Sequence, residues 1–179
     1  METRSFDAIV IGAGQAGPSL AVRLAATGKR VALLERRGLG GTCVNDGCIP
    51  TKTLVASARA AGVVRHAEAW GVDVGGEVVV DMKRVKARKD AVVQDSRDSL
   101  ARWIGSTEGL ELVLGHARFV GPHAVRVGDA TLEAPWIFVN VGGRAVVPDL
   151  PGLSDGPFLT NHSMMDVDFL PEHLVVLGG

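Results

Sequence analysis

The sequence predicts an α/β fold in which a parallel β-sheet carries helices on both faces and a small antiparallel β-meander is attached. Three segments near the start support this prediction. Residues 6–12, FDAIVIG, form an almost continuous apolar run, which is typical of a strand buried on both faces. Residues 14–27 place Leu20 and Leu24 at helical spacing and end at a glycine. Residues 30–35, RVALLE, repeat the buried-strand pattern and complete a strand–helix–strand unit.

Two longer helices are expected in the middle of the chain. Small and apolar residues recur on one side from Pro50 to about His66, and a glycine-rich connection covers 71–80. A second helix over roughly 81–104 shows apolar residues near a 3.6-residue period. Its basic run, 83–89, is interpreted as a solvated helix face, because acidic residues follow at once.

The second half of the chain contains strand patterns and then a linker. Short apolar runs over 110–139, broken by glycine and proline, predict an antiparallel meander that returns to the sheet at 136–143. The last residues, HLVVLGG (173–179), repeat the register of AIVIGAG (8–14). A parallel strand needs a crossover helix, so we expect the front part of a longer protein whose second domain begins here. The expected division is a first domain over 1–147, a linker over 148–172 and the first strand of a truncated second domain over 173–179.

Composition narrows the functional classes. Apolar residues make up 46% of the chain and charged residues 22%, a balance that can bury a core. The net charge of −1 gives no reason to expect nucleic acid or a membrane as a partner. The sequence contains no apolar run near the ~20 residues of a membrane span, and its N-terminus lacks the pattern of a signal peptide. We therefore expect a cytoplasmic protein.

The first turn carries a nucleotide-binding pattern. Residues 12–17, GAGQAG, spell GxGxxG between a predicted buried strand and a predicted helix, and Glu35 ends the next strand. In this Rossmann-like setting the backbone can approach a pyrophosphate at the helix N-terminus, and Glu35 can accept hydrogen bonds from a ribose. A glycine-rich turn needed only for packing is the alternative. The candidate cradle residues are Gly12, Ala13, Gly14, Ala16 and Gly17.

Both cysteines of the chain lie in GGTCVNDGCIPTK (40–52), and three interpretations compete. A metal site is disfavoured, because the motif lacks the two further ligands that a closed zinc site needs. A structural disulfide over so short a loop would contribute about 2 kcal/mol, and it would tend to be reduced in a cytoplasm. The third interpretation is a redox pair.

The redox interpretation predicts different roles for the two sulfurs. Pro50 suits the first turn of a helix, which places Cys48 at the helix N-terminus, where the dipole favours a thiolate by about 0.3–1 kcal/mol. Lys52 adds a positive charge one turn later. Cys43 lies further away in the loop and should be freer to attack a substrate. Asp46 opposes the thiolate unless its carboxylate points to solvent.

Two motifs carry a resemblance to a known family. GGTCVNDGCIPTK (40–52) and IVIGAGQAG (9–17) resemble the class I pyridine nucleotide–disulfide oxidoreductases, flavoenzymes that include dihydrolipoyl dehydrogenase, glutathione reductase and mercuric reductase. VNVGGRAVVPDLPGL (139–153) is similar to the family's later flavin-contacting strand, with Asn140-Val141 where an Ala-Thr pair is usual. The segments 50–60 and 160–179 are most similar to the mercuric-reductase-like branch.

The resemblance implies an electron relay in an FAD-binding domain. NAD(P)H would pass a hydride to FAD, and the flavin would reduce a Cys43–Cys48 disulfide. By similarity, Cys48 faces the flavin, Cys43 exchanges with substrate, and Lys52 lies near the flavin's reactive nitrogen. The other implied FAD contacts are Gly12, Gly14 and Gly17 at the pyrophosphate, Glu35 at the adenosine ribose, and Gly41, Thr42, Ala117 and Gly142 elsewhere.

The resemblance also implies partners. These are NADH or NADPH, a second copy in a full-length homodimer, and a small-molecule disulfide, a metal ion or another acceptor. Mercuric ion has no specific support, because the chain has no extra cysteine pair. His162 is interpreted as an ordinary loop histidine. The alternatives are a catalytically incomplete flavin-binding module and an FAD-dependent oxidoreductase that does not use the cysteines.

Overall fold

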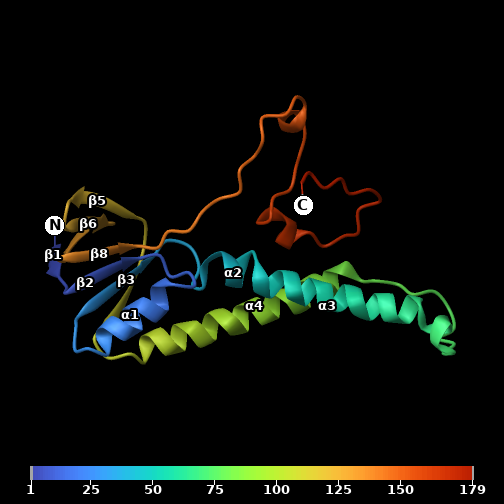
Figure 1. The fold of residues 1–179 in the computed structure, drawn as a ribbon, viewed down its shortest axis with the longest axis horizontal. Coiled ribbons are helices and arrows are strands. Elements are labelled where there is room, and N and C mark those ends of the chain that lie inside the picture. Colours follow the sequence, from blue (N-terminus) through green and yellow to red (C-terminus); the bar gives the residue numbers. More distant parts are fainter. Residues whose placement is uncertain (1, 179) are drawn as a thin grey trace.

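The structure, a computed structural model, describes residues 2–178 and contains two four-stranded sheets packed face to face (Figure 1). In the first sheet all neighbouring strands are parallel, in the order β4-β3-β2-β8. In the second, β5, β6 and β7 form an antiparallel meander, and β1 joins parallel to β7. The strands are β1 (Glu2–Ser5), β2 (Ala8–Ile11), β3 (Val31–Glu35), β4 (Leu110–Leu114), β5 (Ala117–Gly121), β6 (Ala124–Val127), β7 (Ala130–Glu133) and β8 (Trp136–Val139).

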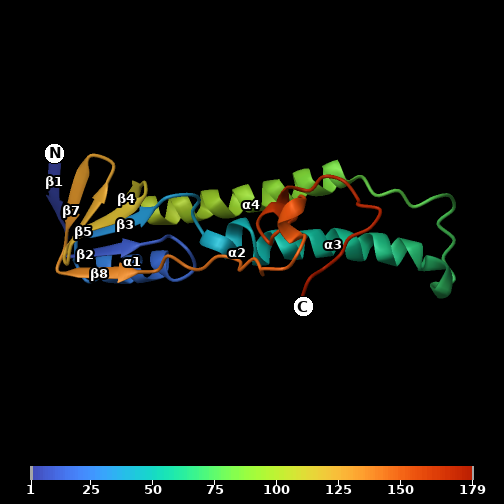
Figure 2. The ribbon, with the colours of Figure 1, turned by 90° about the horizontal axis from the view of Figure 1, so that it is seen from above.

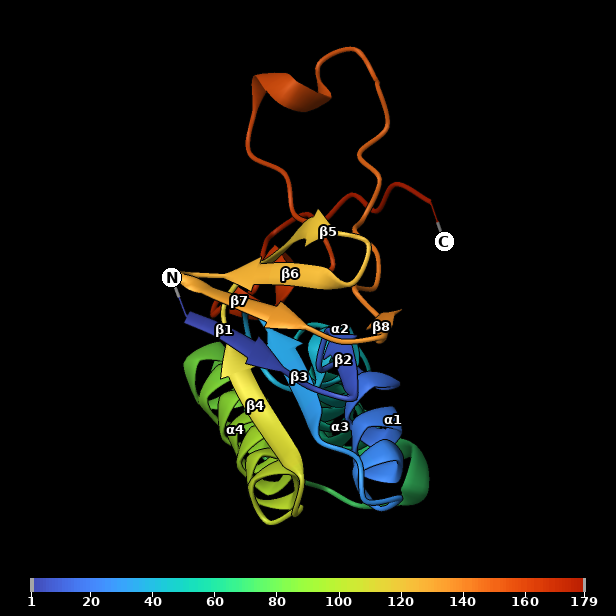
Figure 3. The ribbon, with the colours of Figure 1, turned by 90° about the vertical axis from the view of Figure 1, so that its left-hand side faces the viewer.

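The two faces of the parallel sheet have different covers. The helices α1 (Gly17–Ala25) and α4 (Met82–Gly105) pack on one face, whereas the second sheet packs on the other (Figure 3). Alternation along β2 explains this, because Val10 contacts the helical layer and the preceding Ile9 contacts the second sheet. The mixed α/β class is confirmed. The expectation of helices on both faces is corrected, since the meander sheet occupies the place of a second helical layer.

The long helices form a hairpin that projects beyond the sheets (Figures 1 and 2). In this hairpin α3 (Cys48–Arg65) lies along α4, and the five-residue α2 (Gly41–Asn45) precedes it. The helix predicted from Pro50 begins two residues earlier, at Cys48, and the predicted helix 81–104 is confirmed to within one residue. Asp81 caps α4 by accepting a hydrogen bond from the Arg84 N–H at 3.1 Å.

Two predicted strands differ from the structure. β4, which the sequence pattern placed in the meander, pairs parallel with β3, so the meander is limited to residues 117–133. A short apolar run such as LELVL suits a strand of either sheet, so the sequence pattern of β4 could not identify its neighbour. The predicted strand at 173–179 is not formed over 173–178, where no neighbouring strand of the described chain offers hydrogen bonds.

The segment that follows β8 leaves the sheet and returns over the helical hairpin (Figures 1 and 2). It contains two short 3₁₀ helices, Leu153–Asp155 and Ser163–Asp166. Lys89 of α4 fixes the second one, because its buried Nζ donates to the Met165 carbonyl at 2.8 Å. The predicted linker is thus anchored, and the solvated-face interpretation is wrong for Lys89, which is 3% exposed. No helix within residues 2–178 combines the length and apolarity that a membrane crossing requires.

Candidate functional site

A cavity of about 1330 Å³ opens where the parallel strands end. Gly12 follows β2, Glu35 ends β3 and Asn140 follows β8, and all three line this cavity. The carboxyl edge of a parallel sheet is where open α/β folds bind ligands. A smaller cavity of about 370 Å³ adjoins it and shares Gly12, Glu35 and Gly142 with it. Together they form one elongated site.

Glycines at the edge of the site are required by close packing. A Cβ atom on Gly17 would lie 1.9 Å from the Gly12 carbonyl oxygen, and one on Gly12 would lie 2.3 Å from the Asn140 oxygen. Gly41 approaches the turn from the other side, where a Cβ would lie 2.7 Å from the Gly14 Cα. Packing therefore explains part of the glycine pattern.

The same turn also offers unused hydrogen-bond donors. Within residues 2–178, the N–H groups of Gly14, Gln15 and Ala16 have no protein acceptor, and no side chain caps α1. These groups precede the N-terminus of α1, whose dipole favours an anion. The Gln15 amide is held by the Gly40 carbonyl at 3.3 Å. A diphosphate fits such a cradle, and packing alone does not account for its free donors.

Glu35 connects two loops by hydrogen bonds and is also a candidate ligand for a ribose. Its two carboxylate oxygens accept hydrogen bonds from the N–H groups of Ala13 and Arg37, each at 2.8 Å. The contacts connect the glycine turn after β2 to the loop after β3. Each oxygen keeps a second lone pair for a ligand hydroxyl.

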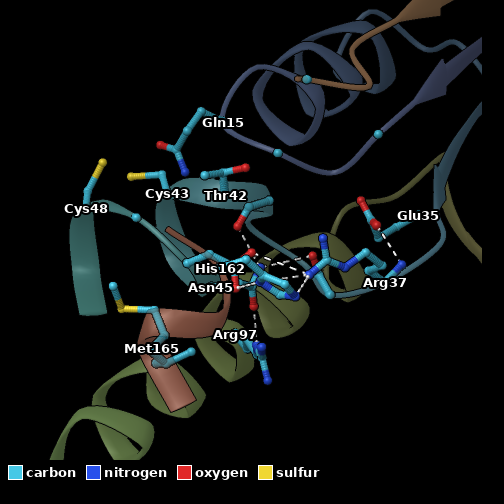
Figure 4. A pocket seen from close by; sticks show the side chains of 18 of the residues that line it. Gln15, Glu35, Arg37, Thr42, Cys43, Asn45, Cys48, Arg97, His162 and Met165 are labelled. Atoms are coloured by element: carbon cyan, nitrogen blue, oxygen red, sulfur yellow. Dashed lines mark hydrogen bonds and ion pairs between the residues drawn. The ribbon is translucent and has the colours of Figure 1, made fainter. Parts of the chain in front are cut away.

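The two cysteines lie at one end of the large cavity (Figure 4). Cys48 is the first residue of α3, as the dipole argument requires, and Cys43 lies in α2 rather than in the loop that the sequence predicted. Both are free thiols in this structure. A hydrogen bond with Cys48, followed by burial, raises the pKa of Cys43, while the Lys52 charge opposes the rise. The hydrogen bond with Cys48 therefore favours the protonated form of the Cys43 thiol.

Removing the second sulfur should release that proton. In a Cys48→Ala protein we expect the pKa of Cys43 to fall, because the hydrogen bond that holds its proton is lost. The measurement is the rate of iodoacetamide alkylation of Cys43 against pH, in the reduced protein. A midpoint unchanged from that of wild type would contradict the coupling between the two thiols.

Asn45 and Arg97 position the cysteine motif, and sequence reasoning missed both. The Asn45 Nδ2 lies within hydrogen-bond distance of the carbonyls of Gly38, Leu39 and Gly41, the last at 2.7 Å. Its Oδ1 accepts a hydrogen bond from Arg97 of α4. An asparagine inside the motif was visible in the sequence, but its partner 52 residues away was not.

The predicted site residues fall into three groups. Ala13 and Gly17 are buried beneath the turn, whereas Lys52 is exposed on α3 and lies outside both cavity linings. Ala117 lines only the smaller cavity. The residues that line the large cavity are Gly12, Gly14, Ala16, Glu35, Gly41, Thr42, Cys43, Cys48 and Gly142.

Residues from the segment that returns over the helical hairpin complete the cavity wall, which no pattern in the sequence predicted. His162 and Met165 line the large cavity, and Figure 4 shows them on the same side of it as Asn45 and Arg97. His162 contacts Asp46, whose carboxyl is 13% exposed, and Arg37. His162 lies in an irregular segment, as the sequence predicted, and its contacts with Asp46 and Arg37 were not expected from the sequence.

Comparison with known proteins places these features in context. The family model described as pyridine nucleotide-disulphide oxidoreductase matches residues 6–179. The chain is 31% identical to dihydrolipoyl dehydrogenase of Acholeplasma laidlawii, over 99% of this chain and 54% of that protein. It is 35% identical to the probable pyridine nucleotide-disulfide oxidoreductase RclA of Escherichia coli K12, over 97% and 37%. Mercuric reductase of Staphylococcus aureus is 28% identical, over 97% and 31%.

A comparison with solved structures also finds similarity to a flavoprotein disulfide reductase. The Cu(II) complex of the HOCl-induced flavoprotein disulfide reductase RclA from Escherichia coli aligns with a TM-score of 0.79 and 33% identity. This alignment covers 94% of the present chain and 36% of RclA. The chain therefore spans about half, or less, of the length of the relatives it matches.

Proposed function

The chain belongs to the pyridine nucleotide-disulphide oxidoreductase family, and on that premise we propose that it is the FAD-binding, dithiol-bearing part of an NAD(P)H-dependent flavoprotein disulfide reductase. One observation carries the proposal. The residues that carry the unused N–H groups of the glycine turn and the two thiols line the same cavity. A site for a diphosphate and a site for two-electron chemistry are thus continuous.

Named groups of the chain would hold the cofactor. The N–H groups of Gly14, Gln15 and Ala16 would bind the diphosphate, and Glu35 would accept from the adenosine ribose. The smaller cavity beside Ala117 would take the adenine. FAD, when bound, supplies the electron pair that opens a disulfide. Gly41, Thr42 and Gly142 would lie along the rest of the cofactor.

The dithiol would cycle between two states. Opening the Cys43–Cys48 disulfide consumes two electrons and two protons and leaves two thiols, the state that the structure holds. In the reduced pair the raised pKa of Cys43 favours the protonated form of that thiol. The N-terminus of α3 favours negative charge at the position of Cys48. Cys43 would attack the substrate once it loses that proton. Closing the disulfide then delivers both electrons to the acceptor.

The acceptor and the assembly belong to the proposal too. A small-molecule disulfide or a thiol-binding metal ion suits a dithiol, and the relatives include a mercuric reductase and a protein solved as a Cu(II) complex. The family resemblance implies a pair of subunits, so we propose a homodimer of the full-length protein. In a reducing compartment a reactive cysteine pair is more plausible than a lasting structural disulfide, so we also propose a cytoplasmic location.

One experiment tests the proposal. The chain is loaded with FAD without oxygen, and the long-wavelength absorbance of a thiolate beside oxidised flavin is recorded. Wild type receives one equivalent of dithionite, so that the dithiol rather than the flavin holds the electron pair. The single-cysteine variants, which have no disulfide to reduce, are recorded with oxidised flavin and no dithionite. We expect this absorbance in wild type and in Cys43→Ser, and its loss in Cys48→Ser. Absorbance in both variants would overturn the assigned roles. FAD binding without the absorbance in any protein would instead favour an oxidoreductase that does not use the cysteines.

A further inference from the structure

The loop between the two cysteines carries a carboxylate that is held from outside the motif. Asp46 lies between Cys43 and Cys48, where an unpaired negative charge would oppose a thiolate. Its side chain is 13% exposed, so it does not simply point to solvent. Instead it contacts the Arg37 guanidinium at 3.5 Å and the His162 ring at 2.6 Å.

The contacts in this cluster suit one tautomer of His162, the one with its proton on Nδ1. The Arg37 guanidinium nitrogen lies 2.9 Å from the His162 Nε2 and 3.3 Å from its Nδ1. A neutral ring with a lone pair on Nε2 can accept from Arg37 there. The ring proton then lies on Nδ1 and points to the Asp46 carboxylate. His162 thus links a permanent cation to the carboxylate. Figure 4 shows His162 beside Arg37, away from the two sulfurs.

The position of His162 is fixed by more than its own contacts. Three residues further on, the Met165 carbonyl accepts from the buried Lys89 at 2.8 Å. Lys89 is also paired with Asp90. Burial by itself would raise the pKa of Asp90, but hydrogen bonds from Lys86 and Lys89 outweigh it and the pKa is lowered. This cluster on α4 therefore holds the segment 160–166 against the cavity wall.

We propose that His162 is a positioning residue for the dithiol, which with Arg37 holds the Asp46 carboxylate in a paired state away from Cys43 and Cys48. The proposal rests on the proposed redox role of the cysteines. The charged groups of the cysteine motif and its neighbours are Lys52 on α3, Asp46 between the two cysteines and Arg37 after β3. Lys89, Asp90 and Arg97 of α4 and Asp166 of the returning segment line the same cavity. The Lys52 charge lowers the pKa of Cys43, and pairing of Asp46 removes a negative charge that would oppose it. Without His162, only the 3.5 Å contact with Arg37 would remain, and the carboxylate could turn toward the thiols and oppose thiolate formation.

The test follows the alkylation of each cysteine by iodoacetamide against pH, resolved by mass spectrometry, in the reduced full chain. The quantity compared is the pH midpoint of alkylation of whichever cysteine reacts at the lower pH. We expect His162→Ala to raise this midpoint by about 0.5–1 pH unit, which is the effect of one released charge several ångströms away. The shift should vanish when Asp46→Asn is combined with His162→Ala. It should also be largely rescued by His162→Asn, whose Nδ2 can replace the donor at Nδ1.

The controls separate positioning from loss of structure. Asn161→Ala removes an exposed neighbour on the same segment and should leave the midpoint in place. A His162→Ala profile equal to wild type would overturn the proposal, and so would a shift that persists in the double variant. The measurement needs no flavin. Failure of the flavin absorbance test with a positive alkylation result would therefore reject the proposed function and retain the positioning role.

Discussion

Replacing Gly17 by alanine is expected to abolish flavin binding and to destabilise the fold by about 3 kcal/mol or more. The new Cβ would lie 1.9 Å from the Gly12 carbonyl oxygen, which belongs to backbone and cannot rotate away. Gly12 is itself fixed, because its N–H donates to the Leu34 carbonyl at 2.7 Å. The turn must therefore shift, and the unused N–H groups of Gly14 to Ala16 shift with it.

Two measurements check this prediction. Urea unfolding gives the loss of stability, and FAD titration should show affinity at least ~100-fold weaker, equivalent to about 2.7 kcal/mol. Gly62→Ala is the matched control, since its Cβ would meet nothing within 4 Å. Because Gly62 lies inside α3, that change should stabilise by about 0.5–1 kcal/mol. A Gly17→Ala protein that binds FAD like wild type would contradict the cradle.

The second large effect is expected for Glu35→Ala, which should cost about 3 kcal/mol of unfolding free energy. The change removes the acceptor of two backbone N–H groups, those of Ala13 and Arg37, and hydrogen bonds to a charged group contribute about 1.5–3 kcal/mol each. Ala13 is fully buried, so its N–H would find no water in exchange. The glycine turn and the loop after β3 would separate, and FAD affinity should fall together with stability.

The chemistry of the side chain gives a graded test. Glu35→Gln keeps one acceptor oxygen and should lose about half as much stability in urea unfolding. Glu133→Ala, on an exposed carboxylate of β7, should change the free energy of unfolding by no more than ~0.5 kcal/mol. Equal free energies of unfolding for the Glu35→Ala and Glu133→Ala proteins would contradict the prediction. They would show that Glu35 serves only as a candidate ligand and that its two backbone hydrogen bonds do not stabilise the fold.

Local patterns predicted the local parts of this structure. The run 6–12, the turn 12–17 and the motif 40–52 each carry their information within a few residues, so the strand, the glycine turn and the helix at Cys48 follow from sequence. The family resemblance is confirmed on the same motifs. The roles assigned to Cys43, Cys48 and Lys52 remain predictions, and so does the division of the chain at 147 and 172.

The features that the sequence did not predict share a physical cause, which is contact between segments that are distant in the sequence. A five-residue apolar strand such as β4 does not specify its neighbour, and the partner of β3 is decided by the fold. Likewise, Lys89 is buried only because the carbonyl of Met165, 76 residues later, returns to it. The contacts of His162 with Arg37 and Asp46 have the same character. Periodicity describes a face of one element, whereas these contacts depend on where another element lies.

The pairing of β2 with β8 has a consequence for biosynthesis. β2 is made first, yet its neighbour β8 is made more than a hundred residues later, and the Asn140 carbonyl closes against Gly12 only then. During translation the diphosphate cradle therefore stays open on one side until residue 140 has left the ribosome. Cofactor capture should consequently be a late event, and a ribosome stalled before β8 should display a nascent chain that cannot retain flavin.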